Sequence, residues 1–81
     1  MPGDLKGVVV PGYGIDLGWL ESTDNLKVLG YEIYRDDMRV GKVRRATHFM
    51  HLGSAVKGRY TVRAFDYNGN LSESSRPLLV P

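Results

Sequence analysis

Cysteine is absent from this chain of 81 residues. Without it, no disulfide can stabilise the fold, and no thiolate can act as a nucleophile or as a metal ligand. Long hydrophobic runs are missing as well: Val8–Val10 has three residues and no run exceeds it, whereas a helix that crosses a membrane needs about 20. The composition therefore excludes a disulfide scaffold, a thiol enzyme and a membrane-spanning helix, and we expect no membrane partner.

Helical periodicity is missing too, and in its place the chain shows alternation. Large apolar or aromatic residues alternate with polar ones through Gly30–Arg35 and again through Gly58–Asp66. A period of two is typical of strands with one buried and one wetted face. Turn-forming pairs such as Pro11-Gly12 and Asn68-Gly69 separate segments of this kind.

These patterns predict an all-β fold, a seven-stranded sandwich around one hydrophobic core. We expect residues 1–4 to be a linker and residues 5–81 to form one domain. A domain of this size buries only about 60–65% of its unfolded surface, so its core is small. The expected strands cover residues 5–10, 14–20, 30–35, 38–45, 47–52, 59–66 and 71–80, the last interrupted by Pro77.

Counting residues in twos along three of these strands predicts which side chains form the core. Trp19 has the same parity as its apolar neighbours, which assigns it to the core and not to a sugar-stacking surface. The residues expected to point inward are Ile15, Leu17, Trp19, Tyr31, Ile33, Tyr60, Val62 and Ala64.

With these motifs in this order, the chain resembles a fibronectin type III domain, an immunoglobulin-like β-sandwich, of the kind found as accessory modules in secreted bacterial glycosidases and chitinases. The resemblance spans nearly all of residues 5–80. It implies that the partners are neighbouring modules of the same polypeptide, that the location is extracellular, and that the isolated domain is a monomer. It rests on Leu17-Gly18-Trp19, where the family has Leu-Ser-Trp, and on the stretches Ser22–Asn25, Gly30–Asp36, Tyr60–Asp66 and Gly69–Ser72.

Two positions depart from the family's pattern. Asp37 stands where the family usually has Gly in the hairpin after Gly30–Arg35, and a positive φ there would strain it by roughly 1 kcal/mol. The family's corner tyrosine is expected at Gly58 if Leu52 is the leucine that precedes it, and there it is missing. The resemblance therefore predicts a looser bend between Leu52 and Gly58.

No pattern in the sequence predicts catalysis, a metal site or a cofactor. His48 and His51 are an odd number of residues apart, so they lie on opposite faces of a strand and cannot chelate one metal. Asp36 and Asp37 are adjacent at an expected hairpin tip, and open solvent there cannot raise a pKa as a general acid requires. We therefore expect no catalytic, metal-binding or cofactor-binding residue.

Calcium is an alternative that the sequence leaves open. Two loops of the expected sandwich emerge at the same end and carry several oxygen-bearing side chains, which calcium prefers as ligands. Against this, Leu71 stands where a helix-hand calcium loop has Gly, and Asx-turns around an Asn-Gly hairpin explain the same residues. The side chains concerned are Glu21, Asp24, Asp66, Asn68 and Asn70.

The outward aromatic residues define a candidate binding face, which consists of Tyr34, Arg63, Phe65 and Tyr67. An exposed aromatic pair there has three possible uses: packing against an adjacent module, cross-strand stabilisation, or weak contact with a glycan or a protein. Glu32 and Arg63 are expected to pair across the same face.

Positive charge is concentrated in the middle of the chain. The net charge is only +2, yet eight basic residues and two acidic ones lie between Arg35 and Arg63. Because the net charge is modest and no nucleic-acid motif is present, we expect no nucleic-acid partner. The positive charges of residues 38–45 are better explained as protection of a sheet edge against pairing with another strand.

The sequence therefore predicts a non-catalytic spacer or interaction module of a larger, secreted, bacterial carbohydrate-active protein. The alternative is a carbohydrate- or protein-binding module that uses the candidate binding face together with the neighbouring arginines.

Overall fold

The computed structural model describes residues 1–22 and 27–81, and that part of the chain contains seven strands and no helix. Five strands, β2 to β6, begin and end within one residue of the predicted bounds. The strands are β1 (Gly3–Val10), β2 (Gly14–Leu20), β3 (Gly30–Arg35), β4 (Met38–Arg44), β5 (His48–Leu52), β6 (Gly58–Phe65) and β7 (Leu78–Val80).

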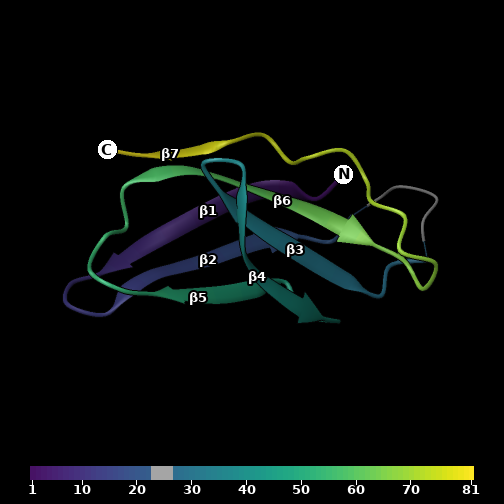
Figure 1. Ribbon diagram of the computed structural model, residues 1–81, viewed down its shortest axis with the longest axis horizontal. Helices are drawn as coiled ribbons and strands as arrows, with labels where there is room; N and C mark the ends of the chain where they lie inside the picture. The colour runs from purple at the N-terminus through teal and green to yellow at the C-terminus, as the bar shows by residue number, and fades with distance from the viewer. Residues whose placement is uncertain (23–26) are drawn as a thin grey trace.

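The strands form two antiparallel sheets (Figure 1). One sheet has the order β1-β2-β5 and the other has the order β4-β3-β6-β7. Each sheet supplies side chains to one common core, so the predicted all-β sandwich is confirmed. No helix in the described residues is long and apolar enough to cross a membrane.

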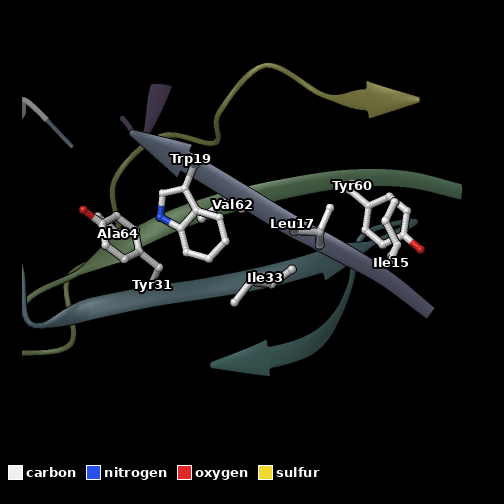
Figure 2. Close-up of a cluster of buried hydrophobic side chains, with 8 residues drawn as sticks. All are labelled: Ile15, Leu17, Trp19, Tyr31, Ile33, Tyr60, Val62 and Ala64. Atoms are coloured by element: carbon white, nitrogen blue, oxygen red, sulfur yellow. The ribbon is translucent and has the colours of Figure 1, made fainter. Parts of the chain in front are cut away.

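The core consists of the eight side chains that the alternation predicted (Figure 2). They come from β2 in one sheet and from β3 and β6 in the other, and each is at most 6% exposed. The Trp19 and Tyr31 rings meet edge to face with their centroids 5.4 Å apart, a geometry that aromatic pairs favour. The core residues are Ile15, Leu17, Trp19, Tyr31, Ile33, Tyr60, Val62 and Ala64.

A two-residue turn at Asp36-Asp37 joins β3 to β4. Both residues have positive φ, 52° and 66°, which is the conformation of the type I′ turn that matches the twist of a hairpin. The Asp36 carboxylate accepts a hydrogen bond from the Arg59 backbone N–H at 2.9 Å. The strained conformation considered for Asp37 is therefore present, and Asp36 shares it.

The chain enters β1 earlier than expected. Gly3 and Asp4, which we expected in a linker, belong to this strand, and Gly3 pairs with Leu20 of β2. Pro2 is fully buried. Asp4 has a φ of 55°, and the pairing register shifts between Gly3 and Lys6. An irregularity of this kind is a β-bulge, which bends the strand locally.

The expected strand over residues 71–80 is mostly wrong, because β7 contains only Leu78–Val80. Upstream of it, Ser72 and Ser75 donate backbone N–H bonds to the carbonyls of Ala64 and Val62, at 2.9 and 2.8 Å. The two serine hydroxyls accept the N–H groups of the same two residues of β6. From Ser72 to Ser75 the chain advances three residues, whereas their partners on β6, Ala64 and Val62, are two residues apart. A regular ladder needs equal steps on both strands, so none forms here.

The predicted absence of a pinned corner before β6 is also wrong. The Tyr60 hydroxyl donates a hydrogen bond of 2.7 Å to the Val56 backbone carbonyl, four residues upstream. This is a tyrosine corner, which fixes the connection from β5 to β6. The prediction failed because Leu52 was used to place the tyrosine at Gly58, two residues before the tyrosine that forms the corner.

The molecule is elongated, with dimensions of 37 × 20 × 19 Å along its principal axes. The C-terminus lies near one end of the long axis, whereas the N-terminus lies in the other half of the molecule, short of its end and beside Arg76 and Pro77 (Figure 1).

Candidate functional site

The outer face of β3, β4 and β6 carries most of the residues that the sequence singled out. Across this face, Glu32 of β3 lies between Lys42 of β4 and Arg63 of β6. In the next row, Tyr34 lies between Arg39 and Thr61. A row of this kind places charged and aromatic side chains within reach of one another.

Glu32 is at the centre of a polar network on this face. The Tyr34 hydroxyl donates to one of its carboxylate oxygens at 2.5 Å, and Arg39 Nη1 donates to the other at 3.0 Å. Lys42 Nζ lies 4.0 Å from the second oxygen. The expected partner Arg63 instead donates from Nε to Ser74 Oγ at 3.1 Å. The charge of Glu32 is therefore balanced from β4, with a further hydrogen bond from β3 and none from Arg63 of β6.

The network sets the protonation state of both of its central groups. Burial by itself would raise the pKa of Glu32, but the hydrogen bonds from Tyr34 and Arg39 and the charges of Arg39 and Lys42 together hold the pKa below its ordinary value. Burial also raises the pKa of Tyr34, and so does its hydrogen bond to the Glu32 carboxylate. At neutral pH the pair thus consists of a carboxylate acceptor and a phenol donor.

Phe65 is not exposed, contrary to the expectation for the candidate binding face. Its parity does point it outward, yet only 5% of the residue is accessible. Its ring lies over Gly30, where a Cβ atom would approach within 2.8 Å of it. Lys42 Nζ lies over the ring at 4.6 Å from its centroid, a cation–π contact. Phe65 therefore stabilises the sheet and cannot stack on a ligand.

Tyr67 is exposed, but it lies outside the strands that form this face. It follows Asp66 in the loop after β6, is 62% accessible, and its hydroxyl accepts a hydrogen bond of 2.5 Å from Arg45 Nη2. The structure therefore does not bring the three aromatic residues of the candidate binding face into one surface.

A shallow groove remains beside Tyr34. Hydroxyl and charged side chains line it, and among the described residues no ion pair engages Arg63. Sequence reasoning found two members of this groove and missed three. Thr61 could have been predicted as a member of the groove, because it pairs with Tyr34 on the neighbouring strand. Ser74 could not, because it lies in the irregular segment after β6. The lining residues are Tyr34, Asp37, Thr61, Arg63 and Ser74.

The two histidines lie on opposite sides of β5, as predicted. His48 pairs with Gly18 on the outer side of its sheet, and His51 pairs with Ile15 on the inner side. The His51 ring meets Tyr60 edge to face, with centroids 6.2 Å apart. The two imidazoles therefore belong to different environments.

The loop after β6 uses its oxygens internally. Asp66 Oδ1 accepts the backbone N–H groups of Asn68 and Asn70, and Oδ2 accepts the Asn70 side-chain amide. The Asn70 side-chain bond is the main cause that lowers the pKa of Asp66. This is an Asx-turn. Asp24 lies outside the described residues, and within them no three acidic, histidine or cysteine side chains gather as a metal site would require.

The acidic hairpin tip after β3 is likewise engaged with the chain itself. Asp37 lies 3.3 Å from Arg59 Nη1, and its side chain is 87% exposed. Arg35 donates from Nε to the Lys57 carbonyl at 2.8 Å. These contacts attach the β3–β4 hairpin to the beginning of β6, which is a structural role.

No family model matches the chain. It is similar to parts of several carbohydrate-active enzymes: 36% identical over 73 residues to an alpha-amylase of Niallia circulans, 38% over 82 residues to exoglucanase B of Cellulomonas fimi, and 33% over 81 residues to chitinase Chi52 of Paenibacillus xylanexedens. These matches cover 89%, 99% and 99% of the chain.

The same matches cover only a small part of each relative. The chain spans 6% of the alpha-amylase, 7% of the exoglucanase and 16% of the chitinase. In these three enzymes, therefore, most of the polypeptide lies outside the similar region. The similarity is that of an accessory module of a carbohydrate-active protein.

Proposed function

We propose that the chain is a non-catalytic spacer module of the fibronectin type III kind within a larger, extracellular, bacterial carbohydrate-active protein. One observation carries this proposal. The same stretch, nearly the whole chain, recurs as 6–16% of an alpha-amylase, an exoglucanase and a chitinase. A part that is common to enzymes named for different activities is not the part that selects or cleaves the substrate.

Three features of the fold support the fibronectin type III assignment. The seven strands divide three and four between the sheets, with the Trp19 ring in the core between them. Tyr60 forms a corner bond to the Val56 carbonyl before the main strand of the larger sheet, as such sandwiches do. The similar regions of the relatives give independent support for an enzyme-linked module.

The shape supports a role in spacing. Because the two chain ends lie apart along the long axis (Figure 1), whatever precedes and follows the module would be held apart. Linkers of flexible chain give a broad range of separations. A folded sandwich of this shape holds its two ends at a single separation.

Spin labels at the two ends would test the spacing role. Because the chain has no cysteine, one cysteine appended to each end places a pair of labels without further substitution. We expect one narrow distance distribution in pulsed electron-spin measurements, centred well below the 37 Å long axis, because Met1 lies beside Arg76 and Pro77, a few residues before the C-terminus. A broad distribution would rule out a rigid spacer. Release of reducing sugars from starch, cellulose or chitin by the isolated chain would rule out a non-catalytic role.

A second candidate function is weak glycan binding, and the groove beside Tyr34 is the observation that favours it. Hydroxyl and charged groups converge there, and among the described residues Arg63 has no acidic partner. We expect millimolar maltohexaose, cellohexaose or chitohexaose to shift the amide resonances of Tyr34, Thr61 and Arg63. Arg63→Ala should abolish the shifts, and Arg76→Ala, outside the groove, should not. No shift with any of the three sugars would exclude this function.

A further inference from the structure

The two sheets of the described chain have four edge strands, and three of these have features that discourage pairing with another strand. At one edge, β4 carries Arg39, Lys42 and Arg44, all exposed. At the other edge of the same sheet, β7 has three residues between Pro77 and Pro81. The short strand β5 lies beside β4, with the Phe49 ring against Gly41. Charge, shortness, proline and cover are the usual means of protecting an edge.

β1 has such protection in its first half only. There the bulge at Asp4 interrupts the register with β2, and Lys6 carries a charge. From Lys6 to Val10 the pairing with β2 is regular, and no charged residue follows Lys6 in the strand. Residues 8–10 are three consecutive valines, a residue type with a strong preference for strands.

The second half of β1 is also uncovered on both faces. Val8 points to the outer face and is 67% exposed, whereas Val9 has the parity of the core residues and is still 45% exposed. The opposite sheet reaches β1 near Gly7, against which the Leu78 side chain packs. In the described structure, β1 pairs with β2 alone. Every second residue of an antiparallel edge strand directs its peptide N–H and C=O away from the sheet, so these groups lack a partner strand.

We propose that β1 pairs antiparallel with β1 of a second copy of this chain, across a two-fold axis at Val8. The two three-stranded sheets would then form one continuous sheet of six strands. In this register Lys6 lies opposite Val10 of the partner copy, so the two lysines are at opposite ends of the new ladder. An isologous contact of this kind closes on itself and gives a dimer, not a fibre.

The inference is independent of the spacer role, and it goes beyond the monomer that the sequence resemblance implies. A ladder of five residues is a small interface, and small interfaces bind weakly. We therefore expect monomers in dilute solution and about half dimer near 1 mM protein, as a weak binding free energy implies. In a longer polypeptide, this contact would hold two parent chains side by side.

Sedimentation equilibrium of the chain and two variants would test the dimer. Val8→Lys places two lysines directly opposite each other in the proposed ladder, and like charges there destabilise pairing. Met50→Lys is the matched control, because Met50 lies on the same outer face and flanks Asp16 on the other side. We expect the average mass to rise toward twice the monomer mass for the natural chain and for Met50→Lys, and to stay monomeric for Val8→Lys.

Amide hydrogen exchange would show whether the contact is a strand pairing. For the natural chain we expect protection of residues 6–10 to increase with protein concentration, with no such increase in Val8→Lys. A natural chain that stays monomeric at its highest soluble concentration would overturn the proposal. So would loss of the dimer in both variants, which would indicate contact through the sheet face. Circular dichroism would establish that both variants fold.

Discussion

Glu32 is the only charged residue that is buried in the described part of the chain. A buried carboxylate is costly unless donors surround it. Here the Tyr34 hydroxyl and the Arg39 guanidinium donate to it, and Lys42 adds a second positive charge. Each donor belongs to this chain, so Glu32 is fully engaged in stabilising the face on which it lies.

Glu32→Gln should therefore destabilise the protein in a pH-dependent way. The folded protein lowers the pKa of Glu32, so its carboxylate stabilises the fold above the unfolded pKa, and this contribution is lost as the pH falls through the folded pKa. We expect the variant to lose about 1.5–3 kcal/mol at pH 7, the magnitude for hydrogen bonds to a charged group, and less below about pH 4.

Urea unfolding of the natural chain and the variant between pH 3 and pH 7 would measure this difference. Glu73→Gln, at an exposed position, is the control and should change little at any pH. A loss of the same size at pH 3 and pH 7 would mean that the charge of Glu32 contributes nothing.

Asp37→Gly should raise the melting temperature. Asp37 has a φ of 66°, which glycine adopts without strain, so the substitution should add about 1 kcal/mol. For a domain of this size, that corresponds to about 4–8 °C. The contact with Arg59 that is lost involves an exposed carboxylate, and such surface pairs contribute little. Calorimetry would measure the shift.

Asp36→Gly is the matched control for this turn. Asp36 also has positive φ, 52°, but its carboxylate accepts the Arg59 backbone N–H, and glycine would lose that bond. We expect little or no gain in stability. An equal increase for both variants would show that the side-chain bond does not stabilise the turn. A decrease for Asp37→Gly would show that the carboxylate contributes more to stability than relief of the positive φ does.

At the scale of the element, the connection from β5 to β6 depends on a bond made by β6 itself. Tyr60 is fully buried, and its hydroxyl reaches back to the Val56 carbonyl. Arg35 adds a second attachment through the Lys57 carbonyl. The connection is therefore held from both the core side and the β3 side, and we expect it to be well ordered.

Tyr60→Phe should weaken this connection without disturbing the ring packing. Removing the hydroxyl leaves the Val56 carbonyl without its partner, and a lost hydrogen bond of this kind costs about 1–2 kcal/mol. Thermal unfolding would measure the loss, and amide exchange of residues 53–58 should become faster. Tyr13→Phe is the control, because Tyr13 is 69% exposed and should be neutral. Unchanged stability in Tyr60→Phe would mean that the corner bond is not formed in solution.

At the scale of the whole molecule, the two sheets share a single core. Trp19 comes from the three-stranded sheet and its ring meets Tyr31 from the four-stranded one. The described residues therefore offer no second core on which either sheet could remain folded alone. We expect the sheets to unfold together in one transition, as small domains usually do.

Trp19→Ala should remove a large share of the total stability. Truncating a buried tryptophan costs about 3–5 kcal/mol, and a chain of this length has about 4–12 kcal/mol in all. We expect amide exchange to accelerate in both sheets by the same factor. Leu79→Ala, at a position 70% exposed, is the control. Faster exchange confined to the sheet of β2 would contradict the single shared core.

The sequence alone determined the number of strands, most of their bounds and the inward face of three of them. Strand alternation is a local property, and a buried face requires it wherever the strand lies. That is why Trp19, Tyr31 and Val62 could be assigned to one core before their strands were placed.

Only the tertiary structure decided how exposed the outward side chains are and which of them meet. Parity placed Phe65 outside, but the space over Gly30 and the cover by Lys42 buried it. Likewise, the hydrogen-bond donors to Glu32 are on β3 and β4, where the sequence had predicted Arg63 of β6. The bond from the Tyr60 hydroxyl to the Val56 carbonyl was not predicted either. Such contacts depend on which strands become neighbours and on the space between them, and alternation along one strand contains neither.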